Sequence, residues 1–204
     1  MDVAVTGDNV AVVSHDPWLP GGTLIRALSS AELRDRAPTI PTLAEVLALA
    51  DRGPFLFNIE VKSFPDDPDL APPPLDFAAL VLSEIDRFTL SARAMVQSFD
   101  FRVLHAARLL APEIPRGALF ESGDDFVSIA RKAAASIAVP EFHLVSGSNV
   151  AAAHAAGFEV YTWTPNMPAE WQPLIDADVD AIITDDPAAL LHFMGPRTDT
   201  DARG

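Results

Sequence analysis

Glu60 and Lys62 are charged residues at the end of an otherwise apolar run, FLFNIEVK, at positions 55–62. Side chains of a strand alternate between two faces, so Glu60 and Lys62 share one face with Asn58 while the apolar residues take the other. We expect this polar face to perform chemistry or to reach water. A plain ion pair at the end of a strand is the simpler alternative.

Other predicted strands also end in polar or aromatic residues. These are His15-Asp16-Pro17, Gln97-Ser98-Phe99, Trp163 with Asn166, and Asp185-Asp186. An imidazole titrates near neutrality and can transfer protons, which makes His15 a candidate acid-base group, although a histidine in a turn is the alternative. Gln97 could equally satisfy backbone groups, and Trp163 could equally be a core aromatic.

The remaining polar residues at helix ends and in helices favour structural interpretations. Asp186 followed by Pro187 is typical of the cap and first residue of a helix. The other four histidines lie in predicted helices or after a strand, and we expect them to be structural or solvated: His105, His143, His154 and His192.

Composition limits the kinds of partner and metal. The 204 residues include 49% hydrophobic residues, enough for one globular domain with a sizeable core. The chain has no cysteine, so a metal must be held by oxygen or imidazole ligands, which favours a hard cation. A formal net charge of -15 argues against nucleic acid or an anionic membrane as partner. Without a membrane-length apolar run or a signal peptide at its start, the chain as written is expected to be cytoplasmic.

Strand-like and helix-like segments alternate along the chain. Strands are predicted at 3–5, 10–15, 55–62, 93–99, 115–121, 135–140, 158–164 and 180–186, and helices at 76–88, 100–111, 124–135, 148–157 and 187–194. This order predicts an α/β fold with a parallel sheet, and the number of repeats favours a barrel. A (β/α)8 barrel usually needs about 250 residues, so the barrel is expected to be incomplete. The polar strand ends would then lie on its catalytic rim.

Seven segments in order resemble the glycerophosphodiester phosphodiesterase family. They are the stretch from Asp2 through the HD at His15, then SSAELR, IPTLAEVLAL, NIEVK, VQSFD, VYTWTPN and IITDDP. The resemblance covers about residues 2–190 and implies a TIM (β/α)8 barrel of the phosphatidylinositol phospholipase C-like type. It implies hydrolysis of glycerophosphodiesters to an alcohol and sn-glycerol 3-phosphate with a divalent cation, Mg²⁺ or Ca²⁺.

The resemblance also implies roles for individual residues. Asp2 would be the aspartate of an E-x-D motif and a metal ligand, together with Glu60. Lys62 would lie next to the phosphate, and His15 would be one of two acid-base histidines. Apart from the resemblance, Gln97 and Trp163 at strand ends are expected to contact the substrate. The role of Asp2 depends wholly on this alignment, because the residue by itself indicates nothing.

The chain departs from the family pattern at its start. In the family, a strand ending in H-R-G carries the other catalytic histidine, and the glutamate of E-x-D would fall one residue before Met1. The resemblance therefore implies a barrel that lacks its first strand and helix, through a truncated gene model or a degenerate gene, with impaired activity. The expected domain is 1–195, followed by a disordered tail at 196–204.

Two other function classes remain open from the sequence. One is a phosphodiesterase for another substrate, such as a lysophospholipase D or a phospholipase C-like enzyme. The other is a non-catalytic barrel that still binds metal and phosphate. The preferred alcohol headgroup and the oligomeric state are also left open.

Overall fold

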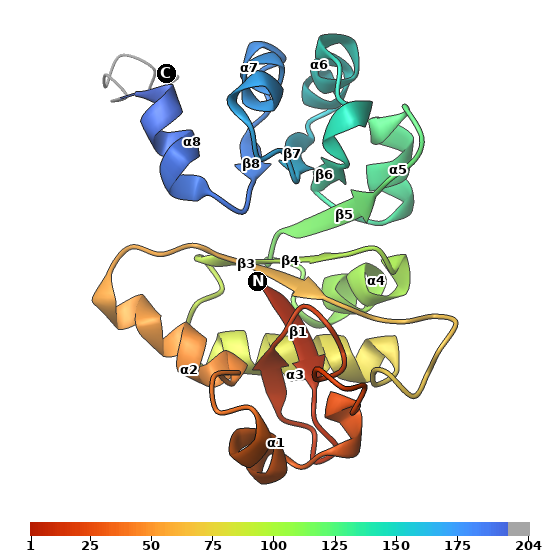
Figure 1. Cartoon of the computed structure of the whole chain (residues 1–204). Coiled ribbons are helices and arrows are strands. Elements are labelled where there is room, and N and C mark those ends of the chain that lie inside the picture. Colours follow the sequence, from red (N-terminus) through yellow and green to blue (C-terminus); the bar gives the residue numbers. More distant parts are fainter. Residues whose placement is uncertain (196–204) are drawn as a thin grey trace. The chain divides into compact units, whose positions relative to one another are not determined.

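The computed structural model describes residues 1–195, which form two compact units (Figure 1). Unit 1 comprises residues 1–118 and 130–136, and unit 2 comprises residues 119–129 and 137–195. The boundary passes through β5 (Arg116–Phe120) and α5 (Phe126–Lys132). The expected single domain at 1–195 stays a prediction, and the expected tail at 196–204 lies outside the described residues.

Unit 1 contains a sheet in the order β2-β1-β3-β4, followed by the start of β5. The strands are β1 (Asp2–Val5), β2 (Ala11–Val13), β3 (Phe57–Val61) and β4 (Ala94–Ser98). The pairs β1–β3, β3–β4 and β4–β5 are parallel, as the sequence predicts. All eight predicted strands of the chain are present among the described residues.

The expectation of an entirely parallel sheet is wrong at β1 and β2, which pair antiparallel. Only residues 6–10 connect them, and a connection this short can only reverse the chain direction. Asn9 adopts the left-handed conformation (φ 62) that such a turn needs. The hairpin brings Ser14 back beside Asp2, whose carbonyl accepts a hydrogen bond from the Ser14 amide at 3.0 Å.

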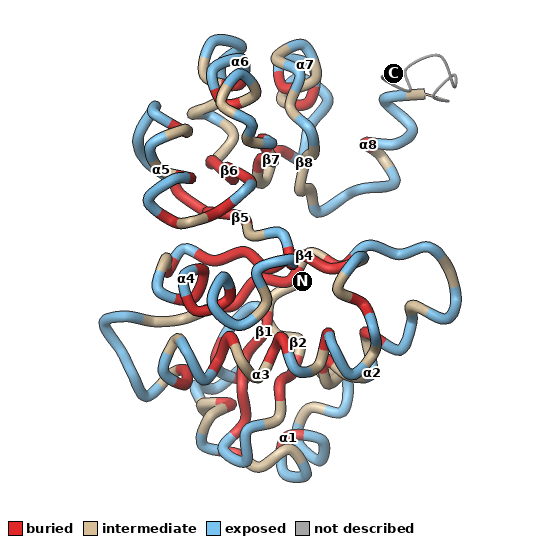
Figure 2. Tube along the Cα trace, turned by 180° about the vertical axis from the view of Figure 1, so that it is seen from behind, coloured by how far each residue is buried: buried red, intermediate tan, exposed pale blue. Residues whose placement is uncertain are grey.

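Four helices complete unit 1 together with the end of α5. They are α1 (Ser30–Arg36), α2 (Leu43–Leu47), α3 (Pro74–Arg87) and α4 (Phe101–Leu110). Capping boxes begin α1 and α2, at Ser29 with Glu32 and at Thr42 with Glu45. In α3, buried residues recur at helical spacing and pack on the sheet in one apolar core, whose members from both include Val3, Ile59, Val61, Phe77, Val81, Ile85 and Val96. Figure 2 shows buried residues along β1, β2 and β4.

Unit 2 continues the alternation of strands and helices. It contains β6 (Ile137–Pro140), α6 (Gly147–Ala155), β7 (Glu159–Trp163), α7 (Pro168–Asp176), β8 (Ala181–Ile183) and α8 (Pro187–Met194). The pairs β6–β7 and β7–β8 are parallel. As predicted, Asp186 caps α8 by accepting a hydrogen bond from the Ala189 amide, and Pro187 begins the helix.

Two arginines fix the loops at the amino ends of neighbouring strands. Arg93, just before β4, donates to the carbonyl oxygens of Phe55, Gly53 and Ala50 at 2.9, 2.6 and 3.3 Å. Arg116, the first residue of β5, holds three other carbonyl oxygens in the same way, those of Ala134, Pro112 and Ile114. A planar guanidinium can reach several carbonyl groups at once, which a lysine ammonium does less well.

We expect Arg93→Ala to lower the free energy of unfolding by about 1–3 kcal/mol, because partly buried carbonyl groups lose their donors. Urea denaturation measures the change, with Arg131→Ala as the control at an exposed arginine. Equal unfolding midpoints for the two variants would contradict a stabilising role for Arg93.

Candidate active site

The site in unit 1 begins with two acidic residues on adjacent parallel strands. The register of β1 and β3 places Asp2 directly opposite Glu60, and the Glu60 amide donates to the Met1 carbonyl at 2.8 Å. Glu60 is only 9% exposed, and its side chain is within hydrogen-bonding distance of the Asp2 carboxyl group. The structure therefore brings together the two residues expected to bind a metal.

The environment of Glu60 favours its neutral form. Burial raises the pKa of Glu60 to about 7, with a further rise from the negative charge of Asp2 and an opposing effect from Lys62. A buried carboxylate facing another carboxylate is unfavourable unless a proton or a cation lies between them. This arrangement has the chemistry of a cation site.

A small cavity lies at the carboxyl ends of β3 and β4. Its volume is about 170 Å³, and its lining residues are Glu60, Val61, Lys62, Ser63, Phe64, Ser98 and Phe99. Lys62 is half-buried and follows Glu60 by two residues, so a cationic and an acidic group face the same space. Glu60 and Lys62 thus line one cavity together with Val61 and Ser63, and their predicted shared face stays a prediction.

Gln97 lies beside Glu60 and bonds to Asn58. The register of β3 and β4 pairs Glu60 with Gln97, and the Asn58 side-chain amide donates to the Gln97 side-chain oxygen at 3.0 Å. Asn58 Oδ1 is the one buried side-chain polar atom of residues 1–195 that lacks a hydrogen-bond partner. The sequence analysis placed Asn58 on the polar face but gave it no role.

His15 follows the hairpin strand β2 and is open to solvent. Its side chain is 74% exposed, and its Nδ1 lies 2.8 Å from Asp16 Oδ1. Because the preceding residue, Ser14, bonds to the Asp2 backbone, His15 leaves the hairpin next to the strand that carries Asp2. The Asp16 contact engages Nδ1 and leaves Nε2 as the ring nitrogen for other contacts.

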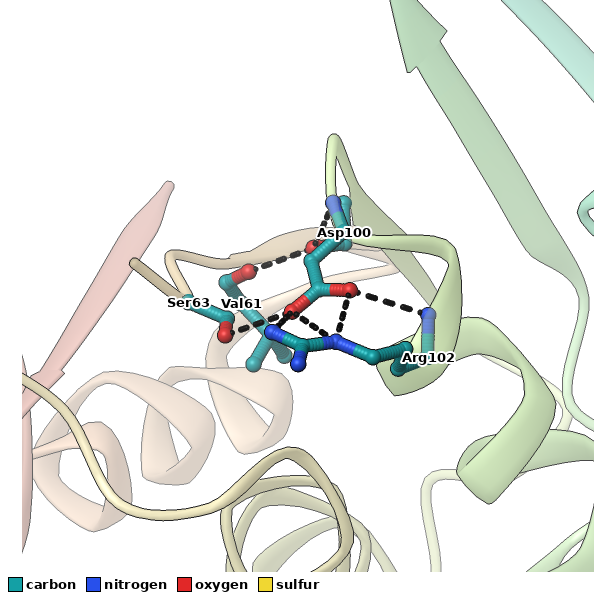
Figure 3. A network of polar contacts seen from close by, with 5 residues as sticks. Val61, Ser63, Asp100 and Arg102 are labelled. Carbon is teal, nitrogen blue, oxygen red and sulfur yellow. Dashed lines mark hydrogen bonds and ion pairs between the residues drawn. The ribbon is translucent and has the colours of Figure 1, made fainter. Parts of the chain in front are cut away.

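Asp100 is the centre of a polar network that includes two residues of the cavity lining, Ser63 and Ser98, and that the sequence did not predict. Figure 3 shows Asp100 at its centre, with hydrogen bonds to Ser63 and Arg102. The Asp100 side chain is 5% exposed and accepts from Ser63 Oγ at 2.7 Å and from Arg102 Nη2 at 2.8 Å. Burial acts to raise the pKa of Asp100, but the hydrogen bonds from Arg102 and Ser63 outweigh it, so the pKa lies below its usual range. The only sequence signal was a helix-capping aspartate after a strand, which gives no hint of burial.

Polar residues of unit 2 also gather at strand ends. Trp163 donates from its indole nitrogen to the Val139 carbonyl at 2.9 Å. The Asn166 amide donates to Asp185 Oδ2 at 2.7 Å, and its oxygen accepts from Thr184 Oγ1 and from the Asp185 amide. These contacts hold the ends of β7 and β8 together within unit 2. The expected contact of Trp163 with substrate stays a prediction.

Across residues 1–195, no group of three or more histidine, cysteine, aspartate or glutamate side chains is close enough to hold a metal ion. The Asp2–Glu60 pair thus supplies two carboxyl groups, and a cation bound there would take its other ligands from water or substrate. Hard cations such as Mg²⁺ commonly bind in this way, through one or two carboxylates.

Taken together, β/α repeats with acidic, cationic and imidazole groups at strand ends define the class of barrel enzymes that act on phosphate esters. The sequence matches the model of the glycerophosphoryl diester phosphodiesterase family over residues 1–189. The chain belongs to this family.

Named relatives and solved structures agree with this assignment. A glycerophosphodiester phosphodiesterase of Caldanaerobacter subterraneus is 26% identical over 95% of this chain and 84% of its own length. A solved glycerophosphodiester phosphodiesterase of Parabacteroides distasonis is 25% identical, with a TM-score of 0.79 over 92% of this chain and 79% of its own. A phosphodiesterase of Oleispira antarctica, solved with the product sn-glycerol-3-phosphate, has a TM-score of 0.82 at 22% identity and covers 95% of this chain and 83% of its own. The chain thus has the TIM-barrel type of fold that the resemblance implies.

None of the helices within residues 1–195 has the length and apolar character needed to cross a membrane.

The raised pKa of Glu60 predicts a pH-dependent stability in the absence of metal. Between pH 4.5 and about 7 the folded state keeps the Glu60 proton while the unfolded chain loses it, so the free energy of unfolding falls as pH rises. We expect Glu60→Gln to be more stable than the wild type at pH 8 in EDTA, by on the order of 1 kcal/mol or more, with little difference at pH 4.5. Urea denaturation at both pH values measures it, with exposed Glu113→Gln as control. If the free energies of unfolding of Glu60→Gln and wild type differ by the same amount at pH 8 and pH 4.5, the raised pKa of Glu60 is contradicted.

Proposed function

We propose that this protein hydrolyses glycerophosphodiesters to an alcohol and sn-glycerol 3-phosphate, with a divalent cation bound by Asp2 and Glu60. The observation that carries the proposal is the pairing of Asp2 with the buried Glu60, which lines one small cavity together with Lys62. Two acidic groups next to a cationic one match a phosphate diester neutralised by both a metal and an ammonium group. The Oleispira antarctica phosphodiesterase, which shares this fold, was solved with sn-glycerol-3-phosphate, which supports the product class.

The residues of the chain fit a hard cation. Asp2 and Glu60 offer oxygen ligands, and the unfavourable approach of their carboxyl groups would be relieved by a positive charge. A bound Mg²⁺ or Ca²⁺ would neutralise phosphate charge and orient the ester oxygens. The two residues would thereby hold substrate and cation at the carboxyl end of the sheet.

Lys62 would stabilise negative charge on the phosphate, and His15 would transfer a proton. The Lys62 ammonium would bind a non-bridging phosphate oxygen and stabilise the charge that develops during displacement. His15 would transfer a proton through Nε2, because Asp16 engages Nδ1 at 2.8 Å and orients the ring. Gln97, fixed by Asn58, would donate from its amide to the substrate, and Trp163 would contact the glycerol or headgroup.

The reaction can be tested directly with glycerophosphocholine and glycerophosphoethanolamine. We expect turnover that EDTA abolishes and that Mg²⁺ or Ca²⁺ restores, and a loss of at least about a hundredfold in His15→Ala, the usual scale for an acid-base group. His143→Ala is a matched control, because His143 is 75% exposed and its Nδ1 contacts Glu141 in the same way.

Four results would contradict the proposed function. Full turnover in EDTA would exclude the metal role, and equal loss in the two histidine variants would exclude the specific role of His15. Binding of phosphate without any turnover would indicate the non-catalytic alternative. Preference for lysophospholipids over glycerophosphodiesters would indicate a lysophospholipase D-like enzyme.

Metal binding gives a second test that does not depend on turnover. We expect isothermal titration calorimetry to detect one weakly bound Mg²⁺ or Ca²⁺ per chain, since only two protein carboxylates are available. Glu60→Gln and Asp2→Asn should each abolish the heat of binding, whereas Asp16→Asn, which changes a solvent-exposed carboxylate, should not. Titrations that are identical in wild type and Glu60→Gln would exclude this metal site.

A further inference from the structure

The residues on both sides of Lys62 are hydrogen-bonded to the end of β4 and to the segment that follows it. Ser98 Oγ donates to the carbonyl of Val61 at 2.8 Å, and Ser63 Oγ donates to Asp100 Oδ2 at 2.7 Å. Lys62 is therefore bracketed by two hydrogen bonds, and Figure 3 labels Val61, Ser63 and Asp100. Lys62 lines the small cavity together with Glu60, Val61 and Ser63.

Asp100 is the centre of this bracket. Its Oδ1 accepts from the Arg102 amide at 3.0 Å and from Arg102 Nε at 2.9 Å, and its Oδ2 accepts from Ser63 Oγ and Arg102 Nη2. Its own amide donates to Ser98 Oγ at 3.1 Å. Asp100 therefore contacts both serines. Its carboxylate binds Ser63, which follows Lys62, and its backbone amide binds Ser98, which holds the carbonyl of Val61.

The carboxylate at the centre of the network is buried and fully paired, whereas the Arg102 side chain is 58% exposed. Ser98 is 1% exposed, and every acceptor oxygen of Asp100 has at least two donors. Charge-assisted hydrogen bonds of a guanidinium with a carboxylate are stronger than neutral ones and fix geometry in two directions. Capping of α4 uses only Oδ1, which accepts from the Arg102 amide. The other oxygen, Oδ2, is therefore free to accept the hydrogen bond from Ser63.

We propose that Asp100 is a positioning residue that fixes the start of the β3–α3 loop, and with it the Lys62 ammonium, against the phosphate site. This inference rests on the proposed function for the identity of the substrate. It adds a role for Asp100, which does not line the cavity, through Ser63 and Ser98, which do. A displacement of about 1 Å at a group that aligns the substrate can reduce turnover a hundredfold, so loss of the bracket is costly.

Two variants and a matched control separate positioning from helix capping. Asp100→Asn has a single acceptor oxygen, so it cannot serve the Arg102 pair, the cap and Ser63 together. Ser63→Ala removes only the bond that crosses between the loops and keeps the cap intact. Asp125→Asn is the control, because Asp125 caps α5 through the Ser128 amide at 2.9 Å and one acceptor oxygen suffices there.

The first readout is kinetic. We expect Asp100→Asn and Ser63→Ala each to lower kcat/KM for glycerophosphocholine at least tenfold and to weaken binding of sn-glycerol 3-phosphate, with Asp125→Asn unchanged. The double variant should lose less than the product of the single effects, because the two residues share one hydrogen bond. In a Lys62→Met background, Asp100→Asn should have little further effect, which a general loss of structure would not reproduce.

The second readout is structural and independent of turnover. Amide hydrogen exchange should accelerate in the peptide spanning residues 62–66 of both variants while β3 and β4 keep wild-type protection. If wild type does not hydrolyse glycerophosphodiesters, the proposed function fails, and this exchange pattern together with affinity for inorganic phosphate still decides the positioning role. The positioning role would be overturned if amide exchange and phosphate affinity match wild type in both variants. It would also be overturned if these two quantities change in Asp100→Asn but not in Ser63→Ala. Ser63→Ala keeps the test decisive if Asp100→Asn does not fold.

Discussion

The parallel register of β1 and β3, with Asp2 opposite Glu60, constrains everything else at the carboxyl end of the unit 1 sheet. Opposed residues of neighbouring strands lie only about 5 Å apart, so two carboxyl groups at these positions cannot avoid one another. Burial first, and the nearby Asp2 charge second, raise the pKa of Glu60 to about 7. A positive charge near this pair offsets both effects, and Lys62, which follows β3 directly, supplies one.

The loops at the two ends of these strands are held by other groups than those assigned to the chemistry. Arg93 and Arg116 hold loop carbonyl groups at the amino ends of β4 and β5, while Asp100 and two serines hold the loops at the carboxyl ends. Each such hydrogen bond contributes only modestly to the free energy of unfolding. Leaving one of its buried partners without a bond lowers that free energy much more. The acidic pair and the lysine can then take up positions that would be unfavourable on a mobile loop.

Periodicity was enough to predict the strands and the main helices, because alternation in β3 and helical spacing in α3 each leave one apolar face. It did not predict the antiparallel hairpin, which depends on the shortness of residues 6–10 rather than on pattern. The helices α1, α2 and α7 were not among those predicted. In α7, Pro168 and Pro173 weaken the helical pattern, although the first lies at the favourable start of the helix. Asp100 was missed for another reason: its sequence context is that of any capping residue, and only tertiary packing buries it between Ser63 and Arg102.

The loop between β3 and α3 is fastened at both of its ends and is exposed in its middle, although Ala71 and Pro72 are buried. Ser63 is bound to Asp100 at one end, Pro73 and Pro74 begin α3 at the other, and Pro65 to Asp69 face solvent. Lengthening such a segment adds a loop-closure entropy that grows only with the logarithm of its length. The segment is therefore a modular part of the protein: its composition can diverge or be exchanged by engineering without moving the lysine that precedes it. Selectivity for the outer portion of a substrate and recognition of its phosphate would then evolve as separate traits within one short stretch of chain.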